Sequence, residues 1–204
     1  DVCSSDLQLT KPVGVLALQG DFREHLNTLA VLGQPAISVR TNAELEQVSG
    51  LIIPGGESTV MHKLSVAYGL FEPIRQKIAE GLPVFGTCAG LIMLADRIID
   101  GIVGQETFGG LDVDVQRNAF GHQTESFEID LEFEGITGLV HAAFIRAPLV
   151  QQVGPKAHAV AKLPDGRIVG VRQNNLLGIS FHPEVTNETR VHQLFLKMIA
   201  DAAK

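Results

Sequence analysis

The sequence predicts an α/β fold of three layers, in which a mostly parallel central sheet carries helices on both faces. Two observations support this prediction. Short apolar runs alternate with amphipathic stretches through the first half of the chain, a pattern typical of parallel strands joined by helices. Several of these runs also end in glycine or polar residues, which are common where a strand leaves a buried sheet.

The first half contains four strand signals, each followed by a helix-like segment. The strand signals are residues 13–18 (VGVLAL), 36–39 (AISV), 51–54 (LIIP) and 83–86 (PVFG). Short apolar runs of this kind are typical of strands buried on both faces. The helix signals are the spacing of Phe22, Leu26 and Leu29, a polar segment after residue 39, a stretch around 58–80, and AGLIMLA after Cys88.

The second half has a different pattern. Residues 111–116 and 126–133 alternate apolar and polar side chains, as half-exposed strands do. Residues 158–173 predict a hairpin around Pro164-Asp165-Gly166, and residues 176–184 (LLGISFHPE) predict a strand with a polar tip. The last helix is predicted with Thr186 as its N-cap and with an apolar stripe of Val191, Leu194, Phe195, Met198 and Ile199.

Composition limits the classes of protein that the chain could belong to. Its 204 residues suffice for one buried core, and a net charge of −7 argues against a nucleic-acid partner. We expect residues 1–11, which include Cys3, to be a disordered or artefactual leader and residues 12–204 to be a single domain. Two cysteines make no disulfide framework, and no apolar run could cross a bilayer. The expected location is therefore the cytoplasm.

Cys88 lies between small residues, directly after an apolar run. Gly86-Thr87-Cys88-Ala89-Gly90 has the spacing of a nucleophile elbow, with cysteine where hydrolases often carry serine. Such an elbow would place the sulfur at the N-terminus of the next helix, which favours a thiolate. Taken alone, Cys88 is equally consistent with a buried structural residue. Cys88 lies at the carboxyl end of a predicted strand, and two other predicted strands end in residues that could take part in catalysis. Ligands of open α/β sheets bind at such strand ends, which favours the catalytic interpretation.

The second of these strand ends is His182-Pro183-Glu184. A histidine could accept the thiol proton and return it to a leaving group, and alternate residues of a strand point to the same side. Glu184 could therefore hold the imidazole of His182 in one tautomer. The alternative is a plain exit from a strand.

The third strand end is the glycine pair Gly55-Gly56. Backbone amides can approach a substrate carbonyl closely where no side chain intervenes, so the amides of Gly56 and Ala89 could form an oxyanion hole. The alternative is a simple turn, with Ser58 capping the next helix. Neither a metal site nor a dinucleotide site is predicted, because the sequence lacks the corresponding motifs. No cofactor is expected.

Together these motifs resemble the class I (triad) glutamine amidotransferases, and among them the glutaminase subunits of pyridoxal 5′-phosphate synthases. The resemblance covers residues 13–184. FGTCAGL and HPE are common to many amidotransferases, whereas LQGDFREH, RNAFG and FIRAP select the synthase subunits.

The resemblance implies a flavodoxin-like amidotransferase fold and a reaction. Cys88 would attack the side-chain amide of L-glutamine, and water would then cleave the thioester to give L-glutamate. The ammonia would pass to a (β/α)8-barrel synthase subunit in a large hetero-oligomer that makes pyridoxal phosphate. Carried over by position, the catalytic triad would be Cys88, His182 and Glu184. The glutamine-binding residues would be Gly56, Glu57, Ser58, Arg117, Ile145 and Arg146.

Some points stay open at this level. Gln19, Gly20, Glu24 and His25 are assigned to the partner interface. His122 stands where the family pattern leads us to expect arginine. If this side chain touches the partner or the substrate pocket, histidine would weaken that contact or make it pH-dependent. Two other interpretations remain: a glutaminase with another partner, such as that of histidine biosynthesis, and a regulatory subunit without catalysis.

Overall fold

The structure is a computed structural model that describes residues 9–119 and 126–204. Its centre is a ten-stranded sheet, with a separate two-stranded sheet formed by β7 and β8. The strands are β1 (Val13–Leu16), β2 (Ala36–Val39), β3 (Gly50–Ile53), β4 (Val84–Thr87), β5 (Ala95–Ile98), β6 (Leu111–Gln116), β7 (Phe127–Glu132), β8 (Leu139–Phe144), β9 (Leu149–Val153), β10 (His158–Lys162), β11 (Ile168–Gln173) and β12 (Leu176–Ile179).

One half of the large sheet is entirely parallel and follows the order β2-β1-β3-β4-β12. Its strands are short apolar runs, and β1, β3, β4 and β12 are buried at every residue. The registers pair Ile53 with Gly86 and Thr87 with Ile179, so these strands end at the same edge. Ligands of open α/β sheets bind at such an edge.

The other half is mixed. Strands β11, β9 and β6 follow β12 in antiparallel pairings, β10 pairs with β11, and the edge strand β5 runs parallel to β6. The predicted hairpin over residues 158–173 is present as β10 and β11. The overall prediction of a mostly parallel central sheet is confirmed.

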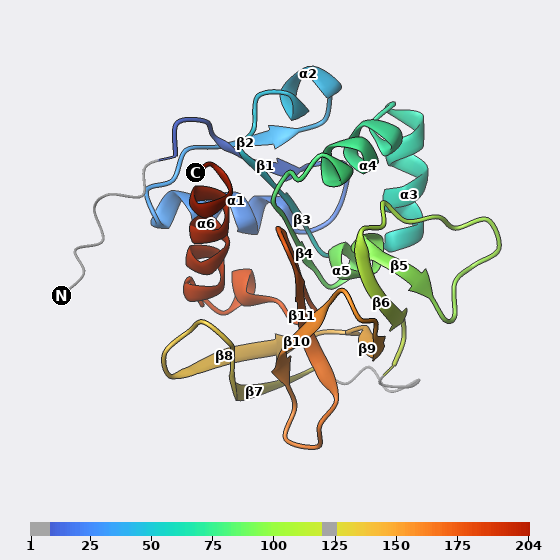
Figure 1. Ribbon diagram of the computed structural model, residues 1–204, viewed down its shortest axis with the longest axis vertical. Coiled ribbons are helices and arrows are strands. Elements are labelled where there is room, and N and C mark those ends of the chain that lie inside the picture. The colour runs from blue at the N-terminus through green and yellow to red at the C-terminus, as the bar shows by residue number, and fades with distance from the viewer. Residues whose placement is uncertain (1–8, 120–125) are drawn as a thin grey trace.

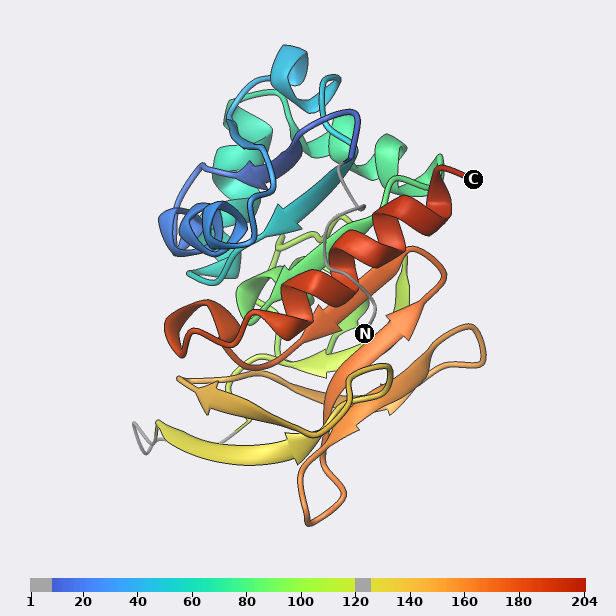
Figure 2. The same cartoon turned by 90° about the vertical axis from the view of Figure 1, so that its left-hand side faces the viewer.

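Helices cover both faces of the sheet (Figure 1). Figure 1 shows α1 and α6 on one side and α3, α4 and α5 on the other, and in Figure 2 α6 crosses in front of the strands. The helices are α1 (Phe22–Val31), α2 (Asn42–Leu45), α3 (Ser58–Ala67), α4 (Phe71–Ala79), α5 (Ala89–Leu94) and α6 (Arg190–Ala202), with a 3-10 turn η1 (Pro183–Val185).

The two helical layers have separate apolar cores. Leu51 and Ile53 of β3 belong to the core under α2 to α5, whereas Ile52 between them belongs to the core under α1 and α6. This alternation is the period of two that a strand buried on both faces requires. The three-layer prediction is thereby confirmed.

Some predicted elements differ in detail. The helical stretch around 58–80 is two helices, α3 and α4, because the chain turns at Gly69, where φ is +70°. The last helix begins at Arg190 with Thr189 as its N-cap, so the predicted N-cap Thr186 was wrong. Strands β5, β8 and β9 were not predicted. Most of the predicted leader lies outside the described residues. Within the described ranges, no helix is long and apolar enough to cross a membrane.

Candidate active site

Cys88 occupies a sharp turn between β4 and α5. Its φ of +52° is unusual for a residue with a side chain, and its amide donates a hydrogen bond to the Ile179 carbonyl at 2.9 Å. The neighbouring glycines make this turn possible. A Cβ atom at Gly90 would lie 2.0 Å from the carbonyl oxygen of Ile53, and one at Gly86 would lie 2.5 Å from the Gly90 carbonyl. The predicted strand–turn–helix arrangement is therefore present at Cys88.

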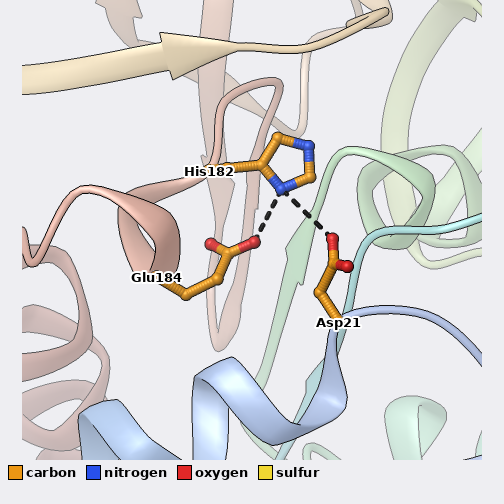
Figure 3. A group of neighbouring side chains, drawn as sticks. All are labelled: Asp21, His182 and Glu184. Atoms are coloured by element: carbon orange, nitrogen blue, oxygen red, sulfur yellow. Dashed lines mark hydrogen bonds and ion pairs between the residues drawn. The ribbon is translucent and has the colours of Figure 1, made fainter.

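His182 and Glu184 lie beyond the end of β12, beside this turn. The Nδ1 atom of His182 is 2.6 Å from Oε1 of Glu184 (Figure 3). The expected strand geometry is wrong, since residues 183–185 form the 3-10 turn η1. The turn nevertheless brings the two side chains together. His182 is held from the other side, because its amide donates to the Ala143 carbonyl of β8 at 2.9 Å.

His182 also contacts the thiol. Burial by itself lowers the pKa of His182, but hydrogen bonds to Cys88 and Glu184 outweigh burial and raise the pKa to about 10. The imidazole is thus held in its protonated form at neutral pH. Since Nδ1 bonds Glu184, Nε2 is the nitrogen left to face Cys88. This arrangement suits a thiolate paired with an imidazolium.

Glu184 is buried, and burial raises the pKa of its carboxyl while the bond to His182 opposes the shift. Asp21 adds a second carboxylate, with Oδ2 3.6 Å from Nδ1 of His182 (Figure 3). The ligand atoms of these three residues lie within 4.8 Å of one another. However, two ligands of one tetrahedral ion with bonds near 2.1 Å would be about 3.4 Å apart. The shorter separation of His182 and Glu184 is that of a hydrogen bond.

The glycine pair after β3 lies close to the same side chains. A Cβ atom at Gly55 would lie 2.6 Å from Cε1 of His182, and one at Gly56 would lie 2.4 Å from the side-chain oxygen of Gln19. The Gln19 oxygen accepts the amide proton of Glu57 at 3.0 Å. Glycine is therefore required here for close approach rather than only for a turn.

A pocket of about 450 Å³ opens over Cys88 and His182. All six residues predicted to bind substrate line it: Gly56, Glu57, Ser58, Arg117, Ile145 and Arg146. No ion pair joins Arg117 or Arg146 to another described residue, so both guanidinium groups are available to a ligand. A larger cavity of about 730 Å³ lies beside β7 and β10. Its lining includes no cysteine and no residue of the triad.

Comparisons with known proteins agree with this geometry. A family model described as the SNO glutamine amidotransferase family matches residues 15–201. The chain belongs to the SNO glutamine amidotransferase family. The predicted class I glutamine amidotransferase is thereby confirmed.

Curated relatives within the family are similar along nearly the whole chain. A protein of Leifsonia xyli subsp. xyli named pyridoxal 5′-phosphate synthase subunit PdxT is 61% identical, over 90% of this chain and 93% of the relative. A protein of the same name from Clavibacter sepedonicus is 60% identical, over 94% of this chain and 92% of the relative. These names agree with the predicted glutaminase subunit.

Solved structures of this fold are also similar. A crystal structure of a glutamine amidotransferase is 49% identical and superimposes with a TM-score of 0.87, over 92% of this chain and 98% of that one. The structure of PurLQS from Thermotoga maritima has a TM-score of 0.70 at 18% identity, over 92% of this chain and 99% of that one. At that identity the likeness concerns the fold alone.

The sequence led to a wrong prediction for one interface residue, and some residues of the pocket were not predicted. His25 is completely buried, so its assignment to the partner interface was wrong. Gln19 lines the pocket, as do Asp21 and Asn118, which were not singled out. Glu24 and Gly20 are exposed. His122 lies outside the described residues. The missed residues lie within the quoted motifs LQGDFREH and RNAFG, and that position was the signal available for them.

Proposed function

We propose that the chain is the glutaminase subunit of a pyridoxal 5′-phosphate synthase. It hydrolyses L-glutamine to L-glutamate and ammonia and supplies the ammonia to a partner synthase subunit. The observation that carries the proposal is the meeting of Cys88 and His182 in one pocket, with Glu184 bonded behind the imidazole. The names of the relatives and the family membership support the choice of pathway.

The first half of the reaction forms a thioester. The sulfur of Cys88 attacks the side-chain amide carbon of glutamine, and the carbonyl oxygen gains negative charge. His182, protonated and bonded to Glu184, gives its proton to the departing nitrogen, and ammonia leaves. The raised pKa of His182 favours this role, because the proton is present before the bond breaks.

The second half reverses the proton movements. The neutral imidazole of His182 accepts a proton from water, and the resulting hydroxide attacks the thioester carbon. The tetrahedral intermediate collapses, the thiolate of Cys88 leaves, and glutamate is released. Glu184 stabilises the imidazolium in both halves.

The negative charge of each tetrahedral intermediate requires hydrogen-bond donors. We assign them to the backbone amides of Gly56 and Ala89. Ala89 is the first residue of α5, and the first amides of a helix have no partner within the helix. Gly56 lines the same pocket as Cys88, and because it has no Cβ, which would collide with Gln19, its backbone can approach a substrate closely. Loss of one such donor costs roughly 3 kcal/mol of transition-state stabilisation.

The remaining pocket residues suit the two charges of the amino acid. Arg117 and Arg146 can pair with the α-carboxylate, since a guanidinium group binds carboxylates through two parallel hydrogen bonds. The carboxylate of Glu57 has the charge that the α-ammonium group requires. Ser58 and Ile145 complete the predicted binding set.

The partner is proposed to be a (β/α)8-barrel synthase subunit in a large hetero-oligomer, and the location to be the cytoplasm. Support comes from the resemblance of LQGDFREH, RNAFG and FIRAP to the synthase subunits, and from relatives named as subunits of a synthase. Residues 12–204 are proposed to act as one amidotransferase domain, of which the family model matches 15–201.

The test is to measure glutamate released from L-glutamine by the chain alone and with a pyridoxal 5′-phosphate synthase barrel subunit. We expect a low basal rate that rises sharply with the partner. Cys88→Ala should lower the stimulated rate by on the order of 10⁴-fold or more, whereas Cys3→Ala, which removes the other cysteine, should leave it unchanged.

Each outcome has a distinct meaning. Absence of glutamate release by folded protein under both conditions would overturn the catalytic proposal and favour a regulatory subunit. Release that rises only with a different synthase, such as the histidine biosynthesis partner, would retain the glutaminase and replace its partner. Equal rates for the wild type and Cys88→Ala would exclude the thioester.

A further inference from the structure

Two buried histidines that do not belong to the proposed triad form a chain of contacts that ends at Glu184. His25 of α1 and His192 of α6 are both fully buried. Nδ1 of His25 lies 2.9 Å from Nε2 of His192, and Nε2 of His25 lies 3.2 Å from the hydroxyl of Thr87. The same Nε2 is 3.7 Å from Oε1 of Glu184, the oxygen that bonds His182. The mechanism above does not use either histidine.

The hydrogen bonds decide which nitrogen of His25 carries the proton. If Nδ1 carried it, Nε2 would turn a bare lone pair toward the Glu184 carboxylate, which is repulsive. In addition, His192 would then accept on Nε2 and bear a proton on Nδ1, a buried atom without a hydrogen-bond partner among the described residues. The other tautomer removes the repulsion, and Nδ1 of His192 then carries an unpartnered lone pair instead of an unpartnered N–H. His192 donates from Nε2 to Nδ1 of His25, and His25 presents its Nε2–H to Thr87 and Glu184.

The carboxylate of Glu184 is incompletely hydrogen-bonded. Its Oε2 is buried without a hydrogen-bond partner among the described residues, and the Nε2 of His25 faces the other oxygen, Oε1, where it can stabilise the negative charge that both oxygens share. The titratable groups that face Glu184 are His182, His25 and Asp21, and the charge of Asp21 opposes ionisation of Glu184. Those that face His25 are His192, His182 and Glu184. The pKa of His25 is lowered, mainly by burial and then by the two neighbouring histidines. The imidazole of His25 is therefore neutral and acts as an N–H dipole.

We propose that His25 is a positioning residue of the triad: a neutral imidazole, fixed by His192, that aims its Nε2–H at Glu184 and keeps that carboxylate ionised and oriented toward His182. At 3.7 Å the contact is longer than a full hydrogen bond. Its effect is therefore that of a fixed dipole on a dry, incompletely bonded carboxylate. The inference rests on the proposed glutaminase function, which it deepens.

The test uses two near-isosteric variants of His25. The amide nitrogen of glutamine can reach the position of Nε2, whereas that of asparagine reaches only the position of Nδ1. His25→Asn should lower kcat about 10-fold with KM within about twofold, and should move the acidic limb of the kcat/KM profile up by about one pH unit. His25→Gln should restore most of kcat and the position of the limb. Thermal unfolding of both variants reports their folding.

Two results from the variants would overturn the proposal. One is wild-type kcat and an unshifted acidic limb in both variants. The other is an equal loss in both variants with the limb unmoved, which would indicate a purely structural role.

A measurement on the wild type keeps the proposal testable even if the variants do not fold. Nitrogen-15 NMR of the histidine side chains should show His25 as the neutral tautomer protonated at Nε2. A proton on Nδ1 of His25, or a positive charge at pH 7, would contradict the proposal. This readout does not require turnover, so a failure of the proposed glutaminase reaction would be recognised separately, as absent glutamate release by the wild type.

Discussion

Three buried histidines lie in one connected group, yet their environments favour opposite charge states. Burial lowers the pKa of His192 to about 3, and burial together with neighbouring histidines lowers that of His25 well below its usual value. His182 is also buried, but its pKa is raised to about 10. The difference is in the partners. His182 bonds a carboxylate and a thiol, whereas His192, within residues 9–119 and 126–204, bonds another imidazole alone.

The comparison shows that burial alone does not predict the charge of a histidine. Desolvation always penalises the imidazolium, and nearby negative charges and hydrogen-bond acceptors can reverse that penalty. Glu184 lies between the two kinds of histidine, with His182 at 2.6 Å and His25 at 3.7 Å from the same oxygen. The pocket side of the group is therefore charged, and the side under α1 and α6 is neutral.

Replacing the carboxylate should weaken the contrast and have the largest effect. Glu184→Gln keeps the size of the side chain and removes its charge. The bond to Cys88 remains, so the pKa of His182 should fall from its raised value without losing all of the shift. We expect kcat for glutamine hydrolysis to fall by roughly 10³- to 10⁴-fold. Glutamate release and nitrogen-15 NMR of His182 measure the two effects.

A matched control is Glu188→Gln. Glu188 is also buried, but it pairs with Arg190 at the start of α6 and does not touch the triad. This variant should keep kcat within a few fold and leave His182 protonated at neutral pH. An unchanged pKa of His182 in Glu184→Gln would contradict the role assigned to Glu184.

The two kinds of histidine should also affect stability with opposite signs. Below pH 6.5 the unfolded chain binds protons at His25 and His192 that the folded protein does not, so the unfolding free energy should fall as the pH is lowered. Each contributes roughly 1.4 kcal/mol per pH unit while its folded form stays neutral. The raised pKa of His182 stabilises the fold below pH 6.5, and this contribution is lost as the pH rises toward 10.

Urea unfolding at pH 7.5, 6 and 5 tests the acidic side of this prediction. His192→Phe should make the pH dependence shallower by about one proton. His158→Ala, which removes an exposed histidine of β10, should leave the slope nearly unchanged. An unfolding free energy of the wild type that does not change between pH 6 and 5 would show that the buried pair is not held neutral.

The smallest expected effect is on substrate binding in the pocket. Arg146→Lys keeps the charge but loses the planar fork, so KM for glutamine should rise about 10-fold while kcat stays within about twofold. Steady-state kinetics measure both constants. Arg75→Lys on α4, away from the pocket, is the control. A change in kcat instead of KM would place Arg146 in the chemistry rather than in binding.

Local patterns predicted the parallel half of the sheet well. Strand β2 has the predicted bounds, and β1, β3 and β4 differ from theirs by one or two residues, because continuous apolar runs bounded by glycine are strong signals. Strands β5, β8 and β9 were missed. Only one residue of β5 is fully buried, and β9 is buried at two of five. Their position depends on pairing with distant strands, which no local pattern shows.

The candidate site divides in the same way. Cys88, His182 and Glu184 carry short motifs with fixed chemistry, so they could be named before any geometry was known. The contact between His182 and Glu184 was expected for the wrong reason, as neighbours on a strand, whereas the 3-10 turn η1 makes it. His25 was assigned to the partner interface, and its burial was not foreseen, because the motif LQGDFREH does not indicate burial.

The sequence by itself determined the fold class, the family, and which side chains stand at the ends of the parallel strands, since these follow from local periodicity and short motifs. Only the tertiary structure decided which histidine is charged and which is neutral. His25 and His192 are 167 residues apart in the chain and meet beneath Glu184. The pKa of each imidazole depends on the water and charges removed or added around it when distant segments pack together.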